Sequence, residues 1–147
     1  MSQIAIHLVV TDAATAATWY QDAFGAEEIS RLSLPDGTTF TVELRIADTE
    51  VAVAGEMPAR QMRAPINLNA TSAAFHLQVP DADAAYERAL AAGATEYEPV
   101  HDAFWGVRTG QVLDPFGHRW AVNQRIQDVS QEEIARRAAE LFSGATG

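Results

Sequence analysis

The chain opens with Ile4–Val10 (IAIHLVV), in which larger apolar side chains alternate with Ala, His and Val. Alternation over several residues is typical of a strand with one buried face, and it puts His7 on the other face. Asp12 follows as a helix N-cap, and the alanine-rich run Ala13–Phe24 predicts a helix that ends at Gly25. The segment therefore predicts a strand followed by a helix.

Three extended segments follow this helix. They cover Glu27–Leu34, Thr38–Ile46 and Thr49–Ala54, and turn residues such as Pro35-Asp36-Gly37 separate them. The first part of the chain is therefore predicted to form a βαβββ unit.

The same order of elements returns later in the chain. Ala73–Val79 alternates, Asp81 opens a helix that ends at Gly93, and His76 stands five positions before Asp81, as His7 stands five before Asp12. Repeated supersecondary units are a strong fold signal. Three extended segments again follow: Thr95–Val100, Gly106–Leu113 and Arg119–Gln124.

We therefore expect a single domain over residues 1–147, with half-repeats at about 3–55 and 72–125. The connecting loop 55–71 is a lid, a dimer contact or a simple linker. A capping box at Ser130–Glu133 begins an amphipathic helix over about 130–143, predicted to be a structural cover or a dimer element.

The composition narrows the range of partners that the protein could bind. The 147 residues carry 20 acidic and 10 basic side chains, a formal net charge of −10, which disfavours nucleic acid and membrane surfaces. The chain has no cysteine, so disulfides and thiolate chemistry are excluded. No signal peptide or membrane span is evident, and we expect a cytoplasmic protein.

Several local motifs resemble a known superfamily. They are Asp12–Ala26, Val42–Asp48, Phe104-Trp105-Gly106 with Asp114-Pro115-Phe116-Gly117-His118, and Ile126–Glu133. Together with the repeat, they resemble the vicinal-oxygen-chelate superfamily of glyoxalase I, bleomycin-resistance proteins and extradiol dioxygenases, in its PhnB-like, glyoxalase-like branch. The resemblance implies an α+β fold of tandem βαβββ modules forming an incomplete barrel. It also implies one small-molecule cavity lined by both sheets, and commonly a homodimer.

The resemblance also implies where a metal would bind. Glu43 matches the family's third-strand carboxylate, but the other three ligand positions fall on Ala5, Ala74 and Ala121. His7 and His76 lie two residues further along their strands, on the same faces, displaced by about 6–7 Å. With Glu43 they predict a displaced site for Fe, Mn, Ni or Zn. The alternative is a pair of metal-free histidines that contact the ligand.

Glu43 itself has two interpretations. A buried, unpaired carboxylate has a raised pKa and serves as a general base at neutral pH. A carboxylate paired with Arg45 on the same strand face is a surface ion pair.

Other side chains are predicted to contact a ligand. Arg119 and Asn123 share a face of the last strand, and Arg119 is either an anion-binding group or an exposed strand-end arginine. Phe104 and Trp105 either stack on a planar ligand or seal the barrel, and Gln78 shares the His76 face.

Two functions remain open. One is a small-molecule-binding protein like the bleomycin-resistance proteins. The other is a metal-dependent lyase, isomerase or dioxygenase acting on a small oxygenated substrate through His7, His76 and Glu43.

Overall fold

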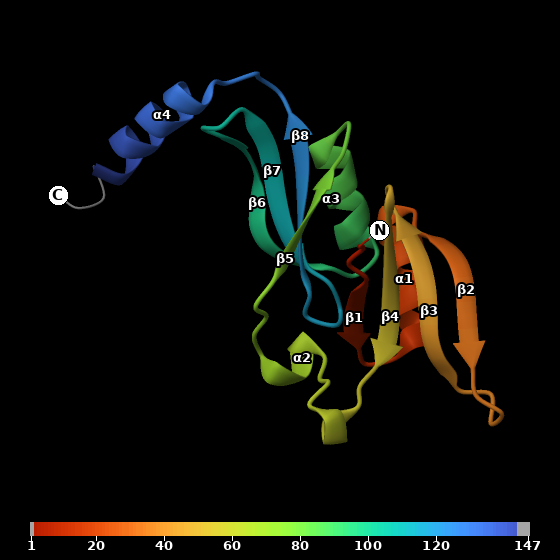
Figure 1. The fold of residues 1–147 in the computed structure, drawn as a ribbon. Coiled ribbons are helices and arrows are strands. Elements are labelled where there is room, and N and C mark those ends of the chain that lie inside the picture. The colour runs from red at the N-terminus through yellow and green to blue at the C-terminus, as the bar shows by residue number, and fades with distance from the viewer. Residues whose placement is uncertain (1, 144–147) are drawn as a thin grey trace.

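The computed structural model of the protein describes residues 2–143 (Figure 1). In chain order the elements are β1 (Ile6–Val10), α1 (Ala13–Phe24), β2 (Glu27–Ser33), β3 (Thr39–Ile46), β4 (Thr49–Gly55), the 3₁₀ helix η1 (Pro58–Arg60), α2 (Pro65–Leu68), β5 (Ala74–Gln78), α3 (Ala82–Ala91), β6 (Thr95–Ala103), β7 (Val107–Leu113), β8 (Arg119–Arg125) and α4 (Gln131–Ser143). No helix within residues 2–143 has the length and apolar character needed to cross a membrane.

Each half of the chain forms its own four-stranded sheet. The orders are β1-β4-β3-β2 and β5-β8-β7-β6, with β1–β4 and β5–β8 parallel and the other neighbours antiparallel. The predicted α+β fold of two βαβββ modules followed by a C-terminal helix is confirmed. The first strand begins at Ile6 rather than Ile4, because pairing with β4 starts at Ile6 and leaves Ile4 92% exposed.

Both long helices begin at the predicted caps. The Asp12 carboxylate accepts the Thr15 N–H at 2.9 Å, and the Asp81 carboxylate accepts the Ala84 N–H at 3.1 Å. These bonds satisfy amide donors that the first helical turn leaves without partners. α1 then ends at Gly25, whose φ of 69° lies in the left-handed region that glycine adopts without strain.

The two helices also cap each other's C-terminal ends. Trp19 Nε1 of α1 donates to the Ala92 carbonyl after α3, at 2.8 Å, and Arg88 Nε of α3 donates to the Asp22 carbonyl of α1, at 2.7 Å. Trp19 and Arg88 each stand seven positions after the N-cap aspartate of their own helix. The repeat therefore produces a reciprocal contact between the halves from unlike side chains.

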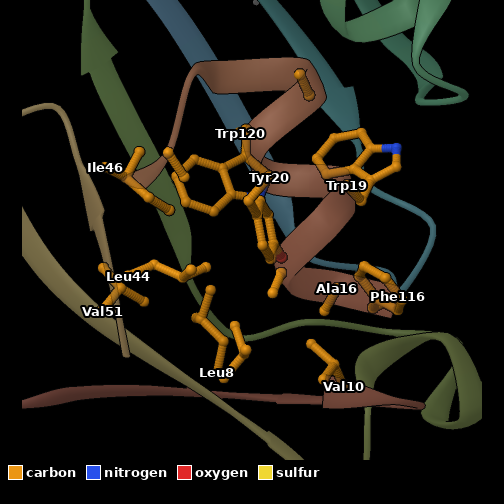
Figure 2. Packing of buried hydrophobic residues seen from close by; sticks show 14 of the residues in the cluster. Leu8, Val10, Ala16, Trp19, Tyr20, Leu44, Ile46, Val51, Phe116 and Trp120 are labelled. Atoms are coloured by element: carbon orange, nitrogen blue, oxygen red, sulfur yellow. The ribbon is translucent and has the colours of Figure 1, made fainter. Parts of the chain in front are cut away.

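One hydrophobic core joins the halves. It contains α1, α3 and the helix-facing side chains of both sheets, and Figure 2 shows Tyr20 of α1 beside Trp120 of β8. The Tyr20 hydroxyl and Trp120 Nε1 both donate to Asp114 Oδ2, whose pKa is raised above its ordinary value because the carboxyl is buried. His118 Nε2 also lies 2.8 Å from the Val9 carbonyl oxygen and so links the two halves.

The helix–sheet contact is built differently in the two halves. Tyr86 of α3 lies over Gly110 of β7, where an added Cβ would sit 3.0 Å from Tyr86 Cδ2 and 2.7 Å from Val100 Cγ2. The equivalent positions in the first half hold Ala17 and Val42, both fully buried. The second half thus has a large helix residue over a strand glycine, whereas the first half has a small helix residue over a larger strand residue.

The connecting segment is anchored to the second half. The Ile66 N–H of α2 donates to the Phe116 carbonyl at 2.9 Å, and a Cβ at Gly117 would lie 2.4 Å from the Ile66 nitrogen. α4, in contrast, extends away from the sheets (Figure 1) and has no buried residue. Arg137 joins it to the second half by donating to the Phe104 carbonyl at 2.8 Å.

Candidate functional site

The open face of the first sheet, the face away from α1, carries one row of side chains across all four strands. The strand registers place His7 opposite Ala52, Ala52 opposite Glu43, and Glu43 opposite Ser30. Neighbouring strands lie about 4.8 Å apart, so His7 and Glu43 stand roughly 10 Å apart at the backbone, on either side of Ala52. Both line a hollow of about 330 Å³ over that alanine.

Glu43 is not neutralised by Arg45. The Arg45 guanidinium instead pairs with Glu50 at 3.5 Å and with Glu27 at 3.8 Å, on the strands to either side. The Glu43 carboxylate, which is exposed, therefore remains available to a ligand on this face.

The second sheet repeats the row with different chemistry. His76 lies opposite Ala121, Ala121 opposite Gln111, and Gln111 opposite Glu98. Ala52 and Ala121 are therefore equivalent positions, and so are Glu43 and Gln111. Alanine keeps the floor of both rows low, and polar side chains stand on both sides of it.

A chain of hydrogen bonds orients His76. Thr109 Oγ1 donates to Asn123 Oδ1 at 2.6 Å, and Asn123 Nδ2 donates to His76 Nδ1 at 2.9 Å. A neutral imidazole that accepts at Nδ1 carries its proton on Nε2. His76 thus offers an N–H donor to a ligand on the open face, and Asn123 acts by holding the ring.

Arg119 stands on the same face of β8 as Ala121. Its Nε donates to Gln111 Oε1 at 2.5 Å, and its Cζ lies 4.3 Å from the centroid of the Tyr97 ring. Arg119 and Tyr97 both line a hollow of about 350 Å³ bordered by α2.

The remaining predicted ligand contacts lie apart from Arg119. Gln78 pairs with Asn123 and lines a hollow of about 450 Å³ together with His76. Phe104 and the 43% exposed Trp105 form an edge-to-face pair in the β6–β7 turn. Val107, just after this turn, is six residues along β7 from Leu113, the partner of Arg119. That distance is about 20 Å, so Trp105 stands at the opposite end of the sheet.

The predicted metal ligands do not come together in one chain. His7 and Glu43 share a hollow that His76 does not line, and residues 2–143 contain no group of three or more His, Asp or Glu side chains that could hold a metal ion. The positions that the resemblance assigns to further ligands are Ala5, Ala74 and Ala121, and alanine has no side-chain donor; the equivalent of Ala121 on β4 is Ala52. The donor set of one chain therefore does not fit a metal.

Sequence reasoning missed three side chains of the second face: Thr109, Gln111 and Tyr97. Strand parity along β7 could have found the first two, since both alternate with the buried Val112 and the closely packed Gly110. Tyr97 could not be found in this way. The pairing of β6 with β7 shifts between Glu96 and Glu98, so Tyr97 is the extra residue of a β-bulge.

The repeated modules and their open faces define the vicinal-oxygen-chelate class of protein. Residues 2–122 match the Glyoxalase/Bleomycin resistance protein/Dioxygenase superfamily, and the chain belongs to this superfamily. The PhnB-like branch stays a prediction.

The chain is also similar to individual proteins. Uncharacterized proteins of Mycobacterium bovis and Mycobacterium tuberculosis H37Rv are each 41% identical over 131 residues, covering 87% of this chain and 86% and 77% of theirs. TioX from Micromonospora sp. ML1 is 28% identical with a TM-score of 0.67, over 86% of this chain and 100% of TioX. The fosfomycin resistance protein FosX from Listeria monocytogenes, 22% identical with a TM-score of 0.63 over 91% and 98% of the two chains, shares the fold.

Proposed function

We propose that the protein binds a small organic molecule on the open faces of its sheets, as a single glyoxalase-like domain of 147 residues. The observation that carries this proposal is the pair of equivalent rows, His7–Ala52–Glu43 and His76–Ala121–Gln111. Binding sites are hollows with a few well-placed polar groups, and each row supplies a low floor between hydrogen-bonding side chains.

The functional unit in this proposal is a homodimer. In one chain His7 and Glu43 on the first face, and His76 and Gln78 on the second, are exposed. Placing the first sheet of one chain against the second sheet of another would cover both faces and enclose the ligand between them. It would also bring a His7 and a His76 into one cavity.

Enclosure would change the chemistry of Glu43. A Glu43 carboxylate enclosed with the ligand would be placed to act as a general base, while His76 Nε2–H would donate to a developing negative charge on the ligand. The alternative function is a metal-dependent lyase, isomerase or dioxygenase in which His7, His76 and Glu43 hold the ion. A FosX variant crystallised with Mn(II) is a metal-bound member of the fold, and the hollow shared by His7 and Glu43 supports two of the three donors.

The binding proposal can be tested by placing larger side chains at Ala52 and Ala121. We expect Ala52→Leu and Ala121→Leu to abolish the rise in melting temperature caused by members of a panel of small oxygenated and planar aromatic compounds. Ala139→Leu, at an exposed position of α4, should keep it. Equal binding by all three variants would contradict a site on these faces.

Two further measurements separate the alternatives. Sedimentation equilibrium should show a dimer, and a monomer at all concentrations would contradict the shared cavity. Mn(II), Ni(II), Fe(II) or Zn(II) should raise the melting temperature only if the metal alternative holds, and then the rise should be lost in His7→Ala and His76→Ala. Glu87→Ala is the control, because Glu87 is an exposed carboxylate on α3, away from the open faces.

A further inference from the structure

We propose that the ligand carries an anionic group, a carboxylate or a phosphate-type oxyanion, and that Arg119 binds it. This inference rests on the proposed function, because Arg119 stands on the open face of the second sheet. It adds the charge class of the ligand and assigns its anionic end to the second half of the chain.

In the part of the chain that the structure describes, the partners of Arg119 are neutral. Gln111 accepts from Nε and the Tyr97 ring stacks against the guanidinium, but neither offsets its charge. Both Nη groups of the planar fork remain for a ligand, in the geometry that suits a carboxylate or phosphate.

The other arginines show how unusual this is in the chain. Six of the ten form ion pairs with carboxylates, and Arg88 is used by the α1 carbonyls. Within residues 2–143, Arg60 and Arg125 also form no ion pair with a carboxylate, but both are exposed, whereas Arg119 is partly buried without one in a chain of net charge −10. The six paired arginines are Arg31, Arg45, Arg63, Arg108, Arg136 and Arg137.

The surroundings of Arg119 fit an organic anion rather than a bare ion. The hollow of about 350 Å³ is lined by the apolar side chains of Leu113 and Ile66 as well as by the polar Thr71. A partly buried guanidinium beside apolar surface binds an anion more strongly than an exposed one, because the surrounding protein screens the charge less than water does.

The β6 bulge is the feature that supplies the stacking ring. An extra residue in one strand re-aims a side chain, and here the bulge accompanies the placement of Tyr97 against Arg119. The first sheet has a shift at the equivalent place, between Glu28 and Ser30, but its extra residue is Ile29. The aromatic ring therefore belongs to the second half alone.

The position equivalent to Arg119 in the first half cannot bind an anion. It is Glu50, and it already pairs with Arg45 at 3.5 Å. In the first half the cation Arg45 is thus neutralised by two carboxylates, those of Glu27 and Glu50. In the second half the cation Arg119 has no carboxylate beside it. His76 lies on the same face as Arg119, so its Nε2–H can donate a hydrogen bond to a second oxygen of the same ligand.

The test measures binding of sodium benzoate, sodium phosphate and uncharged benzamide to the full chain, at constant ionic strength set with NaCl. Dissociation constants come from the saturable rise in melting temperature and from chemical-shift titration. Arg119→Gln is compared with Arg125→Gln, which removes the same charge from an exposed position on the same strand. Arg119→Lys keeps the charge but removes the fork.

We expect benzoate, phosphate or both to bind the wild type and Arg125→Gln with equal affinity, and Arg119→Gln to bind about ten to a hundred times more weakly. Arg119→Lys should fall between them. Binding of benzoate alone would identify a carboxylate ligand, and binding of phosphate alone an oxyanion of that type.

Two results would overturn the inference. One is the absence of saturable binding of either anion up to its solubility limit. The other is benzamide binding that matches benzoate and is unchanged in Arg119→Gln. If that benzamide binding were lost in Ala121→Leu, the proposed function would stand without its anionic ligand.

Discussion

The two halves of this chain share a backbone plan and differ in the chemistry displayed on it. Their strand orders, parallel pairs, aspartate caps, alanine floors and edge-strand bulges correspond. On the open faces, however, Glu43 corresponds to Gln111 and Glu50 to Arg119. The two halves have therefore kept the features that build a sheet, while the residues that would meet a ligand have diverged.

The buried sides diverged too, but in a compensating way. Ala17 and Val42 in the first half correspond to Tyr86 and Gly110 in the second, so volume moves from the strand to the helix. Interiors are close-packed, and such an exchange is tolerated only as a pair.

Reversing one of the two substitutions in this exchange of volume should have the largest effect on stability. Gly110→Val gives the second half the strand residue of the first, and its side chain would meet Tyr86 and Val100. We expect a loss of about 1–3 kcal/mol in the free energy of unfolding, measured in urea. Adding Tyr86→Ala should restore part of it. An equal loss in both backgrounds would show that the two positions do not compensate.

The reciprocal helix caps should contribute less. Trp19→Phe and Arg88→Met each remove a side-chain donor from the C-terminal carbonyls of the other half's helix. We expect each substitution to lower the free energy of unfolding in urea by about 0.5–1.5 kcal/mol. Arg125→Met is the control for loss of an exposed arginine, and a similar value for the control would mean that the Arg88 contact adds nothing.

Arg119→Glu places the charge of the first half's Glu50 on the second face. The substitution breaks no ion pair, so we expect only the loss of the Gln111 hydrogen bond and the Tyr97 contact, which lowers the free energy of unfolding by about 1 kcal/mol or less. Benzoate and phosphate binding should disappear. A large loss of stability would instead identify Arg119 as part of the scaffold.

The smallest effect at neutral pH concerns Tyr86, whose hydroxyl has no hydrogen-bond partner within residues 2–143. Burial first, and then the nearby Glu96 carboxylate, raise its pKa from about 10 to about 12. Between these values the unfolded chain has lost the phenolic proton and the folded chain retains it, so stability falls as pH rises through this window. We expect Tyr86→Phe to match the wild type at pH 8 and to show a shallower decline in stability above pH 10, because buried Tyr20, whose pKa is also raised, still contributes to the decline. Stability is measured by urea unfolding at each pH. Equal declines in the wild type and in Tyr86→Phe would contradict the assignment.

Local sequence signals were sufficient for the fold. The N-cap aspartates, glycine stops and alternating strands are short-range features, and together with the repeat they predicted both modules. Strand pairing across the sheet is not a short-range feature. The Tyr97 bulge, the Gln111 contact with Arg119 and the pairing of Arg45 with Glu27 and Glu50 all depend on registers that no single segment encodes. The homodimer, the cytoplasmic location and the roles of His7, His76 and Glu43 stay predictions.

Chemical-shift mapping of the ¹⁵N-labelled protein during a benzoate titration, repeated with phosphate, tests most directly where the ligand binds. We expect the largest changes on the amides of Ala74–His76 and Arg119–Ala121 and on Arg119 Nε–H. Changes concentrated instead on the helix side, in the hollow lined by Arg88 and Asp81, would contradict a site on the open faces.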